Sequence, residues 1–128
     1  MNYAGCTTET SVILALDRNQ RNLELLAQFL SREGYSVLPV SSLEEFEQII
    51  ISSQPIQLAI IDISGFDRNI WGCCEKLQKW NIPFLVISPR QSTAIQQESL
   101  SHGASSILVK PLVVREFLGI IRSLINQD

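Results

Sequence analysis

The stretch Leu58-Ala59-Ile60-Ile61-Asp62 decides the fold, because it is a short apolar run that ends at a carboxylate. A continuous run of this length, bounded by turn-forming residues, is typical of a strand buried on both faces of a parallel sheet. Val12–Leu16 has the same character and is followed by Asp17. Two buried strands that each lead into an aspartate predict a sheet with polar side chains gathered at one edge.

Strand and helix patterns alternate along the rest of the chain. Leu23, Leu26 and Phe29 recur at helical spacing after the first strand, and Gly34 is placed to end that helix. Strict alternation predicts an α/β fold, with a parallel sheet covered by helices on both faces. We expect one domain over residues 11–128 and a flexible tail over residues 1–10. The expected strands are Val12–Leu16, Tyr35–Val40, Leu58–Ile61, Phe84–Ile87 and Ile107–Val109, with a helix after each.

The composition of the 128 residues narrows the class of protein. The apolar fraction of 45% and the charged fraction of 18% are ordinary for a soluble globular domain. A net charge of −3 without a basic cluster argues against direct binding of nucleic acid. No apolar run is long enough to span a membrane and the start of the chain lacks a secretory signal, so we expect no membrane partner and a cytoplasmic location.

The three cysteines form neither a disulfide framework nor a zinc motif. Cys73 and Cys74 are expected to be one core thiol and one partly exposed thiol on a helix. His102, the single histidine, is expected to lie at the end of the fourth helix as a cap residue, without a role as ligand or base. One of Trp71 and Trp80 is expected to be partly exposed, because nine residues of separation place them on different helix faces.

Four polar residues of complementary chemistry follow four of the expected strands. They are Asp17, Asp62, Ser88 and Lys110. A carboxylate can act as a nucleophile toward a phosphoryl group, and a hydroxyl and an ammonium supply donors to its oxygens. Any one of the four could instead be a helix cap or turn residue, since such residues are common at strand ends. The joint pattern predicts a phosphoryl-handling edge of the sheet.

With these residues in place, the chain resembles the receiver domain of two-component response regulators from about Val12 to Ile125. The resemblance implies a flavodoxin-like (βα)5 fold, a doubly wound five-stranded parallel sheet in strand order 2-1-3-4-5. It rests on Ile13–Asp17, Asn22-Leu23-Glu24-Leu25-Leu26, Glu33-Gly34-Tyr35, Leu58–Asp62, His102-Gly103-Ala104 and Leu108-Val109-Lys110-Pro111.

The resemblance also implies roles for single residues. Asp62 would be the phosphoacceptor, phosphorylated by a partner histidine kinase or phosphotransfer protein. Ser88 would be the hydroxyl that turns toward the phosphoryl group, and Lys110 its ammonium partner, joined to Pro111 by a cis peptide bond. Such a domain is not an enzyme, beyond assisting its own phosphorylation and dephosphorylation. It signals through a downstream protein partner.

The metal site departs from the family pattern. The family has two adjacent acidic residues after the first strand, whereas this chain has Asp17 followed by Arg18. In a rival alignment with the family pattern, Leu16 stands in place of the first acid and Asp17 is the second. That alignment needs a one-residue insertion. The remaining ligands would be Asp17, Asp62 and the backbone carbonyl of Ser64, so we expect weak or absent Mg²⁺ binding and no other cofactor.

Two orientations of Arg18 stay open at this point. Arg18 could bridge Asp17 and Asp62 and substitute for the metal, or it could point to solvent. In either case Arg18→Asp should regain Mg²⁺ binding, unless the other departures also disable the site.

The remaining departures concern output. Ile107 replaces the aromatic switch residue, Ser64-Gly65-Phe66 replaces the expected Met-Pro pair, and Asn69-Ile70 replaces the Asp-Gly that opens the third helix. In the family, the fourth helix, fifth strand and fifth helix form the output face and a possible homodimer surface. A branched aliphatic side chain cannot alternate between ring poses, so the switch is expected to be weakened or differently wired.

Three functions remain open from the sequence. The first is a receiver phosphorylated on Asp62, and the second is a degenerate receiver that acts as a phosphorylation-independent interaction module. The third is a flavodoxin-like domain that binds a small ligand. We expect the domain either to act through a partner or to be part of a longer protein.

Overall fold

A five-stranded parallel sheet forms the centre of the chain, in the order β3-β2-β4-β5-β6. Along the chain this is the order 2-1-3-4-5, so the expected flavodoxin-like fold is confirmed. The computed structural model describes residues 11–52 and 54–126, and the tail expected over residues 1–10 lies outside them. The elements are β2 (Val12–Leu16), α1 (Gln20–Arg32), β3 (Ser36–Val40), α2 (Leu43–Ile51), β4 (Leu58–Asp62), α3 (Ile70–Lys79), β5 (Phe84–Ser88), α4 (Thr93–Ser101), β6 (Ser106–Val109) and α5 (Val114–Ile125).

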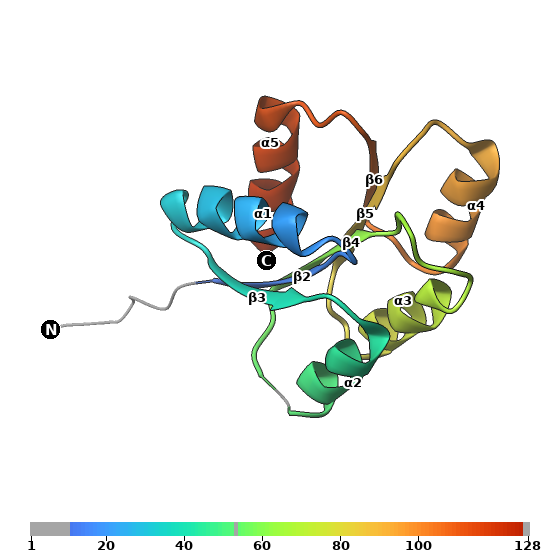
Figure 1. Cartoon of the computed structure of the whole chain (residues 1–128), viewed down its shortest axis with the longest axis horizontal. Helices are drawn as coiled ribbons and strands as arrows, with labels where there is room; N and C mark the ends of the chain where they lie inside the picture. Colours follow the sequence, from blue (N-terminus) through green and yellow to red (C-terminus); the bar gives the residue numbers. More distant parts are fainter. Residues whose placement is uncertain (1–10, 53, 127–128) are drawn as a thin grey trace, which may run out of the picture.

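Helices cover both faces of the sheet, which explains the unbroken apolar runs of the central strands. Figure 1 shows α1 and α5 on one side and α2, α3 and α4 on the other. Ile13 and Ile60 pack with the α1–α5 layer, whereas Leu14 and Ile61 pack with the opposite layer. Because side chains alternate between the faces of a strand, a strand between two helical layers must be apolar at every position.

Side-chain caps determine where several helices begin. Asn19 accepts the amide of Asn22 at the start of α1. At the start of α2, the Ser42 hydroxyl accepts the amide of Glu45, while Glu45 accepts the amide of Ser41. These bonds satisfy amides that have no partner inside a helix.

Within the described residues, no helix has the length and apolar character needed to cross a membrane.

Two polar residues of the candidate site, Asp62 and Ser88, belong to the strands themselves. β4 runs through Asp62 and β5 through Ser88, one residue further than the apolar runs indicated. Asp62 is paired with Ile87 and Ser88 with Val109, so the sheet holds the backbone of both residues.

The expectation for the helical thiols was wrong. Cys73 and Cys74 are both buried against the α2–α3 side of the sheet, because the inward face of α3 includes both positions. Burial raises the pKa of Cys73 to about 11 and that of Cys74 to about 12.

Candidate functional site

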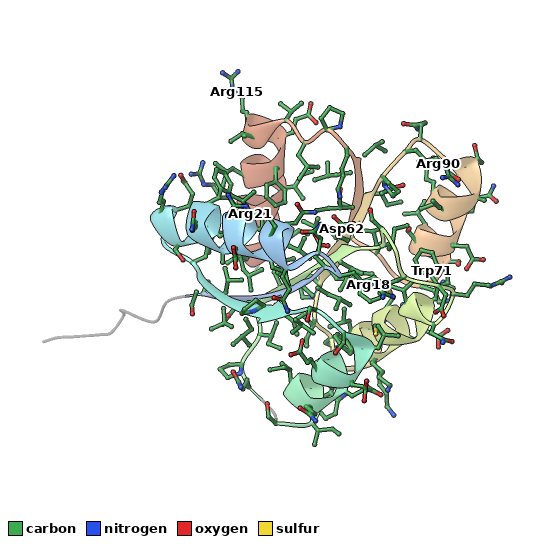
Figure 2. All side chains as sticks on the ribbon, viewed as in Figure 1. Arg18, Arg21, Asp62, Trp71, Arg90 and Arg115 are labelled. Atoms are coloured by element: carbon green, nitrogen blue, oxygen red, sulfur yellow. The ribbon has the colours of Figure 1, made fainter. Side chains whose placement is uncertain are left out.

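The C-terminal edge of the sheet brings together the four polar residues that the sequence singled out. Asp17 follows β2, Asp62 ends β4, Ser88 ends β5 and Lys110 follows β6. All strands are parallel and register-paired, so their C-terminal ends meet at the same edge. Figure 2 shows Asp62 at this edge, where the strands meet the start of α1.

Asp62 is a buried carboxylate with a donor on each oxygen. Only 4% of the surface of Asp62 is exposed. The Lys110 ammonium lies 2.7 Å from Oδ2, and the backbone amide of Ser64 donates to Oδ1 at 3.0 Å. A cis peptide bond joins Lys110 to Pro111, as the resemblance implies. The carboxylate is therefore held in one orientation by a charge-assisted hydrogen bond and a backbone donor.

Asp17 is a second buried carboxylate beside Asp62. Its Oδ1 accepts the backbone amide of Asn19 at 2.9 Å. Burial raises the pKa of Asp17, and the nearby carboxylate of Asp62 raises that pKa further, while the Asn19 amide opposes the shift. Two neighbouring carboxylates thus share one edge of the sheet with the Lys110 ammonium, which is paired with Asp62.

The chemistry of this donor set fits a hydrated divalent cation. Asp17 and Asp62 supply two carboxylates whose mutual repulsion a cation would relieve, and the Ser64 carbonyl could supply a third oxygen. Within the described residues, no group of three or more His, Cys, Asp or Glu side chains could hold a metal ion. The rest of an octahedral Mg²⁺ shell would have to be water.

Arg18 does not bridge the two aspartates, so that hypothesis was wrong. The guanidinium donates through Nη1 to the carbonyl of Gly65 at 3.2 Å and lies over the ring of Phe66, 5.8 Å from its centroid. Among ion pairs of the described residues, none joins Arg18 to a carboxylate. Arg18 is exposed, as the alternative orientation required, but it is also bound to the loop that follows β4. Figure 2 shows it on the α3 side of Asp62.

The Ser88 hydroxyl is bonded to the β5–α4 loop, and the Ile107 side chain packs in the core. The Ser88 hydroxyl donates to the carbonyl of Arg90 at 2.7 Å, and Ser88 is 1% exposed. Ile107 packs against the α2–α3 core cluster. Any approach of the Ser88 hydroxyl to Asp62 therefore requires its bond to the β5–α4 loop to break.

An apolar groove of about 720 Å³ opens beside the two aspartates, between α1, α5 and the loop that precedes α5. Leu25 of α1 and Val114 of α5 line it and are 48% and 56% exposed. Asp17, Asp62 and Lys110 form its polar end. Sequence patterns placed the aspartates and the lysine correctly, but nothing in the spacing of Leu25 or Val114 distinguished them from core residues.

Comparisons with known proteins agree with this geometry. A family model described as the response regulator receiver domain matches residues 13–122. The transcriptional regulatory protein GltR of Pseudomonas aeruginosa is 29% identical over 119 residues, which cover 90% of this chain and 49% of GltR. The chain spans about half the length of the curated relatives it matches.

Two solved structures share the fold closely. A response regulator receiver domain protein (CheY-like) from Methanospirillum hungatei matches with a TM-score of 0.81 and 25% identity, over 92% of this chain and 95% of that chain. A two-component response regulator from Clostridium difficile matches with a TM-score of 0.83 and 22% identity, over 92% of this chain and 98% of that chain.

Proposed function

Because this chain belongs to the response regulator receiver domain family, we propose that it takes a phosphoryl group on Asp62 from a histidine kinase or phosphotransfer protein. The observation that carries the proposal is the pairing of a buried Asp62 carboxylate with the Lys110 ammonium at 2.7 Å. Receiver domains are signalling modules rather than classical enzymes. The chain itself would at most assist its own phosphorylation and dephosphorylation.

The geometry around Asp62 supports in-line phosphoryl transfer. A carboxylate oxygen of Asp62 would attack the phosphorus of a phosphohistidine, the P–N bond would break, and the freed imidazole nitrogen would take a proton from solvent. Lys110 is placed to neutralise charge on the transferred oxygens. The Ser64 amide keeps the carboxylate oriented before the donor arrives.

Receiver domains typically bind Mg²⁺ at the phosphorylation site. In this chain we propose that Asp17, Asp62 and the Ser64 carbonyl would hold it, with low affinity because Arg18 stands where a further acid is expected. When bound, the ion neutralises charge on phosphoryl oxygens. The donors to Asp62 that the chain itself provides are the Lys110 ammonium and the Ser64 backbone amide.

The groove between α1 and α5 supports a protein as phosphodonor. Exposed apolar side chains beside a reactive group are typical of a surface that a partner covers. Leu25 and Val114 border the groove, and its polar end contains Asp62. A partner helix that covers these side chains would bring a phosphohistidine to the carboxylate.

A direct test is phosphorylation by phosphoramidate in the presence of Mg²⁺, followed by intact mass measurement. We expect one phosphoryl adduct on the wild type and none on Asp62→Asn, which keeps the size of the side chain. A receiver of ordinary sequence should react in parallel. No adduct on a folded wild-type protein would reject the proposal.

A second function is supported by Arg18, Ile107 and the Ser88 hydroxyl. Arg18 stands in place of an acid, and Ile107 stands in place of the aromatic switch residue. The Ser88 hydroxyl donates to the Arg90 carbonyl. A degenerate receiver of this kind would bind a protein partner independently of phosphate. Its output or homodimer surface would be α4, β6 and α5, where Leu100 is 57% exposed. The mass experiment separates the two functions, because only the first requires an adduct.

A further inference from the structure

Arg18 is bound to the turn that follows the candidate phosphoacceptor. Its Nη1 donates to the Gly65 carbonyl, and its guanidinium covers the Phe66 ring. A planar guanidinium can make both contacts at once, whereas a lysine ammonium can make the hydrogen bond without the same stacking. The arginine therefore joins the loop after β2 to the loop after β4.

The backbone of this turn is shaped to receive the arginine. Residues 63–66 form a β-turn closed by a hydrogen bond from the Phe66 amide to the Ile63 carbonyl at 3.1 Å. Gly65 has φ +79°, which favours glycine, and a Cβ built there would lie 3.3 Å from Arg18 Cδ. The stem of Arg18 thus lies against the position where any other residue would have a side chain.

The same turn orients Asp62. The Ser64 amide, one residue before Gly65, donates to Asp62 Oδ1 at 3.0 Å. On the other side of Ser64, the Ile63 amide donates to the Ile87 carbonyl and continues the β4–β5 ladder. One end of the turn is therefore anchored by the sheet and the other by Arg18, with the Ser64 donor between them.

We propose that Arg18 is a positioning residue for Asp62: by holding the Gly65 carbonyl and the Phe66 ring, it keeps the Ser64 amide on the carboxylate when no divalent cation is bound. This inference rests on the proposed phosphorylation of Asp62. A bound cation would order the same atoms, the Ser64 carbonyl and the Asp62 carboxylate, so an arginine that orders the turn from outside lowers the dependence of phosphorylation on Mg²⁺.

Amide hydrogen exchange in metal-free buffer, without phosphodonor, tests the positioning directly. Arg18→Ala should speed exchange of the Ser64 and Phe66 amides about tenfold, the effect expected for one hydrogen bond and one exposed cation–π contact. Arg18→Lys should give an intermediate rate. Arg21→Ala is the matched control, because Arg21 is an exposed arginine of α1 whose partner is Glu24, and it should change neither amide.

Arg18→Asp sharpens the test by exchanging the arginine for an acid. In metal-free buffer its Ser64 amide should exchange as fast as in Arg18→Ala, and Mg²⁺ should restore protection at a lower concentration in Arg18→Asp than in Arg18→Ala, because only Arg18→Asp has the additional carboxylate. The fraction of the phosphorylation rate that survives chelation of Mg²⁺ should be larger in the wild type than in Arg18→Ala. Circular dichroism and thermal melting of each variant should show that all are folded.

Unchanged exchange of Ser64 and Phe66 in folded Arg18→Ala would overturn the positioning role. Failure of the proposed function has a different signature: the wild type would take no phosphoryl group. If exchange still responded to Arg18→Ala in that case, the arginine would position Asp62 in a domain that does not use it for phosphate.

Discussion

The Trp71 indole of α3 stacks on the His102 imidazole at the end of α4, with ring centroids 5.4 Å apart and planes 16° from parallel. His102 Nδ1 lies 2.7 Å from the Glu98 carbonyl, and Nε2 lies 3.4 Å from a Glu75 carboxylate oxygen. α4 buries only Ser99 among its own residues. The stack is therefore one side-chain contact that joins the end of α4 to α3.

His102→Ala should loosen α4. Loss of a stacked aromatic pair costs about 1 kcal/mol, which corresponds to a fall of roughly 3–6 °C in melting temperature. The emission of Trp71 should change, measured in a Trp80→Phe background because Trp80 is 57% exposed. Glu75→Gln removes only the charge of a carboxylate whose side chain is 65% exposed and should have little effect. An unchanged emission spectrum in His102→Ala would contradict the stacked arrangement.

Lys110→Met should slow phosphorylation of Asp62 by phosphoramidate. A charge-assisted hydrogen bond contributes about 1.5–3 kcal/mol, so the rate should fall roughly tenfold to a hundredfold. Lys110→Arg keeps the charge and should retain much of the rate. The measurement is the initial rate of adduct formation by intact mass. Equal rates for wild type and Lys110→Met would show that the 2.7 Å contact with Asp62 has no part in transfer.

Ser88→Ala should separate phosphorylation from the movement of the β5–α4 loop. In the wild type, phosphorylation should shift the Arg90 amide resonance, because we expect the Ser88 hydroxyl to leave the Arg90 carbonyl and turn toward the phosphoryl group. In Ser88→Ala the adduct should still form, but the Arg90 shift should be lost. Ser88→Thr retains a hydroxyl and should preserve it. The same Arg90 shift in all three proteins would assign the loop movement to another cause.

Asp17→Asn should stabilise the protein at neutral pH in metal-free buffer. Burial raises the pKa of Asp17 above its ordinary value of 3.8, so the folded protein binds this proton at a higher pH than the unfolded chain does. The free energy of unfolding of the wild type therefore falls as the pH rises from 3.8 to the raised pKa of Asp17 in the folded protein. The advantage of Asp17→Asn should disappear as the pH falls below 3.8. Asparagine can still accept the Asn19 amide.

Urea unfolding across the acid to neutral range measures this effect. Addition of Mg²⁺ should raise the unfolding midpoint of the wild type and not that of Asp17→Asn, because only the wild type has both carboxylates. A variant that is less stable than the wild type at neutral pH without metal would show that burial of Asp17 is compensated by contacts other than those of Asn19.

The sequence by itself determined the sheet, its helical layers and the chemistry at its edge. Continuous apolar runs are possible only for strands covered on both faces, and parallel strands bring their C-terminal residues to one edge wherever the intervening helices lie. Asp17, Asp62, Ser88 and Lys110 could therefore be assigned to one site from their positions after the strands.

Only the tertiary structure decided which contacts these side chains make. Whether Arg18 turns to the aspartates or to Gly65 depends on the conformation of two loops that are distant in sequence. The bond from Ser88 to Arg90 and the stack of Trp71 on His102 likewise depend on side-chain rotamers and helix packing. The physical reason is that periodicity records which face of an element is buried, whereas contacts of a few ångströms are determined by how separate elements meet.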